Sequence, residues 1–269
     1  MKIIAFFAHP DDETMLCGGT VALLASLGVR VHYLCATRGE GGENGEPPLC
    51  SREKLGAVRE QEMRCAVQAL GGASLTFLGY IDPNVDPDGN LFAYTDDMAT
   101  LLRRLAEAAH QVQADVVLTH GSNGEYGHPA HILTHQAARL AFAPTEWDTS
   151  RGVPPSLYTI QANFAQHPRP RLANKDDPAQ LVLDITPVLP QKEAAALCHR
   201  TQHALFVRRP SREAGRPLTV PEVLLRLESL HRVYPPEQAG AGDPLMELLL
   251  PYQWNHSASV EQQPPPQPR

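Results

Sequence analysis

The stretch "IIAFFAHPDDE", residues 3–13, decides the fold, because an apolar run stops there at a cluster of ionisable side chains. The apolar residues are typical of a strand buried on both faces of a parallel sheet. His9, Asp11, Asp12 and Glu13 follow directly. In open parallel sheets, ligands bind beyond the carboxyl ends of the strands. The position of this loop therefore predicts a functional site at the end of the first strand.

Apolar segments that alternate with helical patterns predict the rest of the sheet. Strands are expected at 2–8, 29–37, 74–79 and 115–120, and helices at 14–27, 52–70 and 96–112. This rhythm is typical of right-handed βαβ units, so we expect an α/β fold with a Rossmann-like, mostly parallel sheet flanked by helices. The second half is less regular, with strands expected at 156–162 and 180–185 and a helix at 189–206.

Length and composition predict a single domain. The chain has 269 residues and is 42% hydrophobic, which suits one α/β domain over residues 1–250. The segment 251–269 ends in glutamines and prolines and is expected to be a flexible tail. The net charge of -7 and the lack of a basic block argue against nucleic acid as a partner. No apolar run approaches the roughly 18 residues of a membrane span, so no membrane partner is expected.

The five cysteines are odd in number, scattered and without a CxxC pair. In a chain of this length they favour reduced thiols over a disulfide framework. We therefore expect a cytoplasmic enzyme.

Four polar loops follow the first four predicted strands and should meet at one edge of the sheet. In the first of them, His9 and Asp12 are close enough to converge on one ion, and the fourth contributes His128, His131 and His135. Imidazole and carboxylate ligands suit zinc, and three protein ligands with an open position are the catalytic arrangement. His9, Asp12 and one of these histidines would complete such a set.

Asp11 would then face the water that the metal activates and act as a general base. The alternative is structural: Asp12 would cap a helix, and Asp11 and Glu13 would favour the helix dipole. A lone histidine on a helix is likewise more often a surface or core residue than a ligand. His120, which ends a predicted strand, is expected beside the site.

Several motifs together resemble the PIG-L/LmbE-like N-acetylglucosaminyl deacetylase family. They are "AHPDDE" with "GG" five residues later, "TRGE", "REQEMRCAVQALG" and "GEYGHPAH". The resemblance covers residues 1–140 well and continues more weakly through "DITPVLPQKEAAALCHRTQ". It implies a bacterial deacetylase similar to those of bacillithiol or mycothiol biosynthesis.

The resemblance implies a role for each matching residue. His9, Asp12 and His131 would bind Zn²⁺ or another divalent metal, and Asp11 would be the general base. His128 would act as general acid or stabilise the oxyanion, and Tyr126 would polarise the carbonyl. The residues expected to bind the sugar are Arg59, Asp82 and Glu40.

Alternatives to sugar binding stay open for two of these. Arg59 fits a solvated helix face, and Asp82 fits a turn before Pro83.

The chain departs from the family pattern at Ala130, because the family has "HPDH" where this sequence has "HPAH". The missing Asp would orient or tune the neighbouring histidine, so its absence puts the protonation state of His128 in doubt. Glu125 or Glu40 is a candidate substitute.

The predicted function is zinc-dependent hydrolysis of the N-acetyl group of an N-acetylglucosamine-containing conjugate, with release of acetate and a free amine. The expected partner is thus a small amidated amino-sugar substrate, and the family suggests a homo-oligomer. One alternative is an amidase that cleaves thiol–sugar conjugates. A non-catalytic sugar-binding relative would have lost Asp11 or a ligand, and a nucleotide-binding protein needs a glycine fingerprint where "AHPDDE" stands.

Overall fold

The central strand β1 (Lys2–Phe7) lies within a seven-stranded sheet of order β3-β2-β1-β4-β5-β9-β8 in a computed structural model. The structure describes residues 1–144, 147, 153–236 and 242–255. The other strands are β2 (Arg30–Thr37), β3 (Ser74–Tyr80), β4 (Val116–Thr119), β5 (Ser156–Ile160), β8 (Leu181–Asp184) and β9 (Leu227–Tyr234). The first five in sheet order run parallel, and β9 pairs antiparallel with both β5 and β8. The predicted mostly parallel sheet is confirmed.

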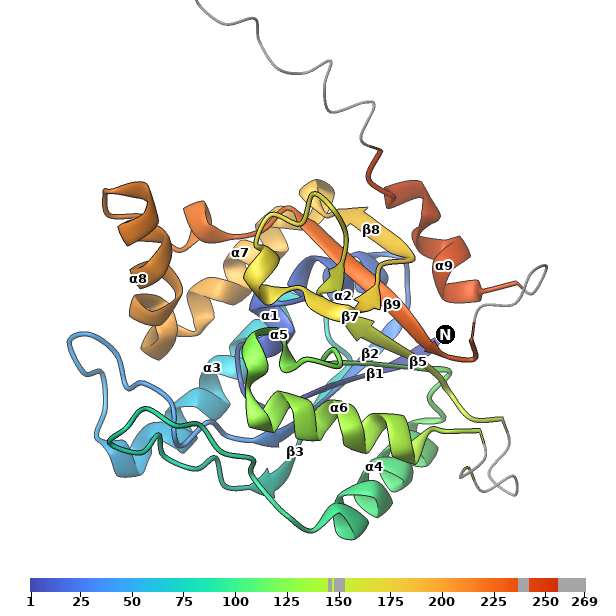
Figure 1. The fold of residues 1–269 in the computed structure, drawn as a ribbon, viewed down its shortest axis with the longest axis horizontal. Helices are drawn as coiled ribbons and strands as arrows, with labels where there is room; N and C mark the ends of the chain where they lie inside the picture. The colour runs from blue at the N-terminus through green and yellow to red at the C-terminus, as the bar shows by residue number, and fades with distance from the viewer. Residues whose placement is uncertain (145–146, 148–152, 237–241, 256–269) are drawn as a thin grey trace, which may run out of the picture.

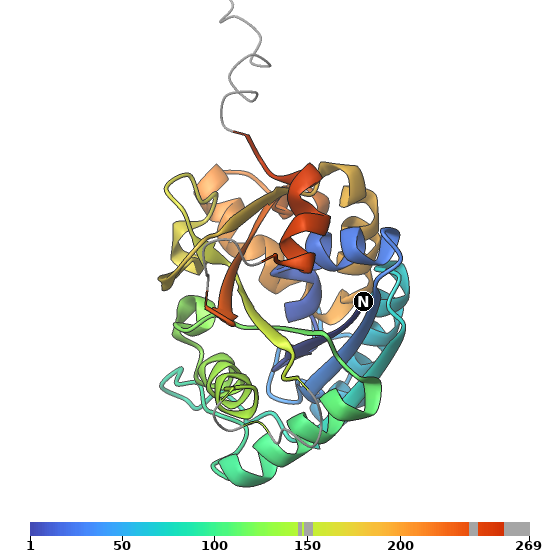
Figure 2. The same ribbon diagram turned by 90° about the vertical axis from the view of Figure 1, so that its right-hand side faces the viewer.

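Helices cover both faces of the sheet. One face carries α2 (Gly18–Ser26), α3 (Leu55–Ala69) and α7 (Leu189–Cys198), and the other carries α4 (Met98–Val112) and α6 (Pro129–Ala141). Figure 2 shows the strands between α4 and α6 on one side and α2 and α3 on the other. The shorter elements are α1 (Asp12–Met15), α5 (Gly124–Gly127), α8 (His203–Ala214), α9 (Pro244–Leu249) and the pair β6 (Ala162–Asn163) and β7 (Asn174–Pro178).

Alternation along β1 explains why this strand is apolar throughout. Ile3 and Phe7 pack in the cluster that contains Met63 of α3, whereas Ile4 and Phe6 pack in the cluster that contains Leu101 of α4. Successive side chains of a strand point to opposite faces, so a strand between two helical layers needs apolar residues at every position. The polar residues that follow β1 therefore mark its exit from the core.

Two of the predicted helices are interrupted. The helix expected at 14–27 is divided into α1 and α2 at Cys17, whose φ is -148°. The helix expected at 189–206 is divided into α7 and α8, with the short 3₁₀ helix Arg200–Gln202 between them. The second break follows from His199, whose buried ring bonds to Glu13 across the fold and adopts a non-helical backbone conformation. The helical periodicity of a sequence carries no information about such a tertiary contact, so it cannot predict the break.

A disulfide between Cys65 and Cys198 corrects the expectation that the cysteines are all thiols. The two residues are 133 positions apart in sequence, on α3 and α7, and their Cα atoms are 5.8 Å apart. Because α3 packs against α7, residues without a recognisable spacing come within reach of each other. Cys17, Cys35 and Cys50 carry free thiols.

The loops that follow β2 and β3 lie beside α8 at the same edge of the sheet, on the left of Figure 1. Within the described residues, no helix is long and apolar enough to cross a membrane. The predicted tail begins at 251, but Gln253 bridges to Leu183 of β8 and Trp254 donates its backbone N–H to Val182. Residues 256–269 of that tail lie outside the described residues.

Candidate active site

The loop between β1 and α1 is folded tightly by its own side chains. The backbone N–H of His9 donates to Asp12 Oδ2 at 2.9 Å, and that of Asp11 donates to Glu13 Oε2 at 2.9 Å. Asp11 has φ +105°, a strained value for a residue other than glycine, and such strain is concentrated at functional sites. Asp12 is the first residue of α1 and Asp11 is its N-cap. The alternative in which Asp12 caps the helix is therefore wrong.

Asp12 lies among three histidine rings. Its Oδ1 is 3.3 Å from His131 Nε2, and its Oδ2 is 3.4 Å from both His9 Nδ1 and His120 Nε2. Burial raises the pKa of Asp12, but His131 and His120 outweigh it and hold this pKa well below its usual range. Among the described residues, the atoms able to hold a cation form two groups that share His131: His9, His128 and His131, and Asp12, His120 and His131. The three predicted ligands are thus divided between two overlapping groups.

The ring of His131 is prepared for a metal by Glu125. His131 Nδ1 is 2.6 Å from Glu125 Oε2, so this nitrogen carries the proton and donates it to the carboxylate. His131 Nε2 is buried 3.3 Å from Asp12 Oδ1 and, within the described part of the chain, has no hydrogen-bond partner, so on a neutral ring it would offer a lone pair to a cation. Histidines that bind metals are commonly oriented by a carboxylate in this way. The donor set at this point therefore fits a divalent cation.

His120 lies beside the site, as expected. Its Nδ1 is 3.0 Å from Glu125 Oε2, and its Nε2 accepts the Ala8 backbone N–H at 3.1 Å. Because both ring nitrogens have partners, His120 is less available to a cation than His131. Burial raises the pKa of Glu125, but His120 and His131 lower this pKa by more than burial raises it. Glu125 therefore remains a carboxylate although it is buried.

Asn174 of β7 holds the loop that carries Glu125, and sequence reasoning missed it. Its Oδ1 accepts the backbone N–H of both Asn123 and Glu125 at 3.1 Å, and its Nδ2 donates to Glu125 Oε1 at 3.3 Å. A Cβ at Gly121 would lie 2.0 Å from the Asn174 side chain, so glycine is required there. Nothing in the sequence pattern near Asn174 points to this role.

His128, the N-cap of α6, is held as a neutral ring. Its Nδ1 accepts the backbone N–H of Ala130 at 3.2 Å, which leaves the proton on Nε2. Burial, followed by the charges of His131 and His9, lowers the pKa of His128 to about 3. Ala130 is fully buried in a hydrophobic cluster. Glu125 is one of the two proposed substitutes for the missing Asp, and it bonds to His131 and His120 rather than to His128.

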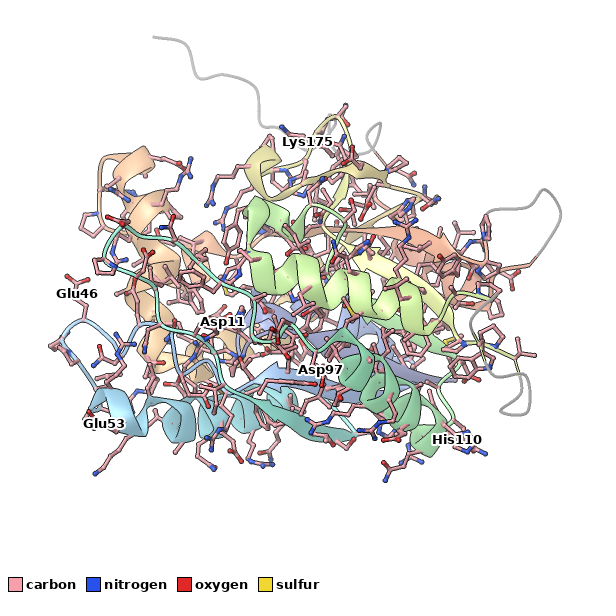
Figure 3. All side chains as sticks on the ribbon, turned by 60° about the horizontal axis from the view of Figure 1, so that its bottom comes forward. Asp11, Glu46, Glu53, Asp97, His110 and Lys175 are labelled. Carbon is pink, nitrogen blue, oxygen red and sulfur yellow. A yellow bond between two sulfur atoms is a disulfide. The ribbon has the colours of Figure 1, made fainter. Side chains whose placement is uncertain are left out.

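Arg59 of α3 contacts Asp11 directly. Its Nη2 is 3.1 Å from Asp11 Oδ2, and its guanidinium also donates to the backbone oxygens of Gly39 and Pro10. The side chain is buried, so the interpretation as a solvated helix face is wrong. Burial raises the pKa of Asp11 to about 6, and the charge of Arg59 opposes this rise. Figure 3 shows Asp11 in the interior, while Glu46 and Glu53 lie at the periphery.

A cavity of about 490 Å³ opens over these residues. Asp11, Arg59, Asp82, Tyr126 and His128 all line it, so the fold brings together most of the residues singled out in the sequence. Asp82 Oδ1 is 3.2 Å from His9 Nε2, and Tyr126 is about half exposed at the cavity wall. The volume is within the range of about 300–1,000 Å³ that small-molecule sites occupy.

Glu40 is placed differently from the other predicted site residues. Its Oε1 accepts from Arg38 Nε at 3.1 Å, and its Oε2 accepts from the Asp82 backbone N–H at 3.2 Å. Among the described residues that line the cavity, Glu40 is absent. Its carboxylate thus joins the loop after β2 to the loop after β3.

Comparison with known proteins identifies a family over half of the chain. The PIG-L family, described as GlcNAc-PI de-N-acetylase, matches residues 4–142. A relative from Kineococcus radiotolerans, named 1D-myo-inositol 2-acetamido-2-deoxy-alpha-D-glucopyranoside deacetylase, is 31% identical over 76% of this chain and 69% of its own length.

Solved structures share the fold. The 4-carboxy-2-hydroxymuconate hydratase of Pseudomonas putida has a TM-score of 0.58 and 24% identity, over 90% of this chain and 99% of its own. The N,N'-diacetylchitobiose deacetylase of Pyrococcus horikoshii has a TM-score of 0.56 and 21% identity, over 86% of this chain and 83% of its own. At these identities the likeness concerns architecture, and one architecture hosts more than one chemistry.

Proposed function

Because the chain belongs to the PIG-L family of de-N-acetylases, we propose that it hydrolyses the N-acetyl group of an amino-sugar conjugate. Water adds to the acetyl carbonyl, the C–N bond breaks, and the products are acetate and a free amine. The observation that carries the proposal is the position of Asp11, which lies in the same cavity as His128 and next to the oriented histidine–carboxylate set. This arrangement would supply a base and a hydrogen-bond donor for the oxyanion within one cavity.

His9, Asp12 and His131 would hold the metal, which we propose to be Zn²⁺ or another divalent ion. When bound, such an ion polarises the carbonyl and lowers the pKa of water. The support for this set is the buried Nε2 of His131, which has no hydrogen-bond partner among the described residues, and the carboxylate of Asp12, which is held 3.3 Å from it. Glu125 fixes the tautomer of His131 and keeps the ring in place.

Asp11 would move the proton. As a carboxylate it accepts a proton from the attacking water, and as a carboxylic acid it passes that proton to the departing nitrogen. A pKa near 6 suits both directions of transfer at neutral pH. The hydrogen bond that His128 Nδ1 accepts and the lowered pKa of this ring favour a neutral His128, so we propose that it is not the acid. Its N–H and the Tyr126 hydroxyl would instead donate to the oxyanion.

The polar wall of the cavity would hold the sugar. Asp82 can accept from a sugar hydroxyl, and Arg59 would orient Asp11 as well as contact substrate. Glu40 would act through the loop that it anchors. The name of the Kineococcus radiotolerans relative supports an N-acetylglucosamine glycoside as the substrate class.

The test is amine release from N-acetylglucosamine conjugates by metal-stripped protein, before and after addition of zinc. We expect zinc to restore turnover in wild type, and Asp11→Asn to lower kcat by at least about 100-fold, as loss of a general base typically does. Asp88→Asn is the control, because Asp88 is an exposed carboxylate of the loop after β3. Equal activity of the Asp11→Asn and Asp88→Asn variants would contradict the role of Asp11.

The same assay separates the alternatives. An amidase that acts on thiol–sugar conjugates would release a product other than acetate, which mass spectrometry distinguishes. A non-catalytic sugar-binding relative would bind the conjugates without turnover at any zinc concentration.

A further inference from the structure

The cavity lining combines buried polar residues, here called the polar half, with half-exposed apolar residues, here called the apolar half; Arg52 and Asn84 are exposed polar residues of the same lining. Asp82 and His128 of the polar half are buried, whereas Val85, Phe92 and Leu205 are 47%, 44% and 46% exposed. Large apolar side chains left half exposed in one pocket are typical of a ligand site. The proposed chemistry at Asp11 uses only the polar half, so the apolar half needs a separate explanation.

Two anchored segments form the walls of the apolar half. Val85 and Phe92 flank a turn in the loop after β3, in which Asp86 Oδ1 accepts the backbone N–H of Asn90 at 2.8 Å and that of Asp88 at 3.0 Å. The side chain of Asn90 donates to Asp86 Oδ2 at 2.8 Å. This turn therefore presents Val85 and Phe92 in a defined arrangement.

The second segment is α8, which carries Leu205 and is fastened to the loop after β2. Arg208 donates to Glu43 through Nη1 at 2.7 Å and Nη2 at 2.8 Å, and Gln202 Nε2 donates to the Glu43 backbone oxygen at 2.6 Å. Because both walls are anchored, the space between them is preformed, and a ligand pays little ordering entropy there.

The charges of the cavity do not favour an anionic group in the apolar half. Arg59 is engaged by Asp11 and two backbone oxygens, and Arg52 donates to the Gly42 backbone oxygen. Glu43 is the partner of Arg208. Both arginines of the described lining thus already donate to protein oxygens, and the described lining contains no other Lys or Arg.

We propose that the substrate carries an apolar aglycone, which binds between Val85 and Phe92 on one wall and Leu205 on the other. This inference rests on the proposed function, because the sugar would occupy the polar half of the same cavity. The proposed substrate differs from that of relatives named for an inositol glycoside, because the aglycone of an inositol glycoside is a polyol. Burial of an apolar group against these side chains is favourable, whereas burial of a polyol leaves hydroxyls without partners.

The first measurement compares deacetylation of the phenyl and methyl glycosides of N-acetylglucosamine, in the same anomeric configuration. We expect the phenyl glycoside to have a kcat/KM about tenfold higher, which corresponds to about 1.4 kcal/mol. In Leu205→Asn this ratio should fall to near one. The matched control is Leu140→Asn, because Leu140 is 45% exposed on α6, away from the cavity, and there the ratio should stay at wild-type value. An unchanged ratio in Leu205→Asn, or preference for an inositol glycoside, overturns the proposal.

Calorimetric titration of both glycosides into Asp11→Asn separates this inference from the proposed function. If wild type deacetylates neither glycoside but the phenyl glycoside binds about tenfold more tightly than the methyl glycoside, the proposed function fails and the apolar subsite stands. If both are deacetylated with equal kcat/KM and bind equally, the subsite fails and the function stands. If neither is deacetylated or bound, both fail.

Discussion

At the residue scale, Glu125 determines which nitrogen of His131 is open to a cation. Replacement by Gln would put an amide where the carboxylate accepts from His131 and His120. We expect Glu125→Gln to weaken zinc affinity roughly 10–100-fold, as loss of a carboxylate that orients a ligand does. Competition with a chromophoric chelator measures this.

Glu40→Gln is the control for that experiment, because Glu40 is also a loop carboxylate but bonds to Arg38 and a backbone N–H. We expect its zinc affinity to match wild type. If the Glu125→Gln variant and wild type bind zinc with equal affinity, Glu125 does not support the metal site.

The same residues show how far sequence reasoning reached. His9, Asp11 and Asp12 could be singled out because they are contiguous and follow a buried strand. Asn174 could not, because it meets Glu125 only after β7 is laid beside α5, and no local pattern encodes that approach. Glu125 could be named only as a candidate substitute for the missing Asp. Its bonds to His131 and His120 could not be predicted, because they depend on a backbone with φ +57° that the folded environment enforces.

At the scale of elements, one buried ion pair joins three segments. Lys192 of α7 donates to Glu228 of β9 at 2.7 Å, and Glu228 also accepts from the backbone N–H of Gly19 and Thr20 at the start of α2. Lys192 is fully buried. The pair therefore fixes α2, the second helix after the active-site loop.

Removal of Lys192 alone leaves the Glu228 carboxylate buried without its cation. We expect Lys192→Met to lower the free energy of unfolding by about 3–5 kcal/mol, as loss of one partner of a buried pair does. Arg209→Met, which breaks the exposed pair with Glu213 on α8, should cost about 1 kcal/mol or less. Urea unfolding of the two variants measures the difference, and equal losses would contradict the structural importance of Lys192.

The positions at which the predicted helices are interrupted also could not be predicted from the sequence pattern. The segment 189–206 has helical periodicity throughout, yet α7 ends at Cys198 because the ring of His199 turns inward to Glu13 at 2.8 Å. The central strands β1, β2 and β4 were predicted well, because a strand buried on both faces must be apolar along nearly its whole length. The antiparallel strand β9 was not predicted.

At the scale of the whole molecule, the Cys65–Cys198 disulfide closes a loop that contains β3, β4 and β5, three of the five parallel strands. Cross-linking across 133 residues restricts the unfolded chain, and the loss of such a bond typically costs about 2–5 kcal/mol. We expect a reductant to lower the melting temperature of wild type. The Cys65→Ser/Cys198→Ser variant should melt at this lower temperature with or without reductant.

Thiol titration under denaturing conditions provides the independent check on the disulfide. Without reductant, three thiols should react in wild type, those of Cys17, Cys35 and Cys50, and with reductant all five cysteines should react. The double variant should give three under both conditions. Five reactive thiols in unreduced wild type, together with a melting temperature that a reductant does not change, would mean that α3 and α7 are held by packing alone.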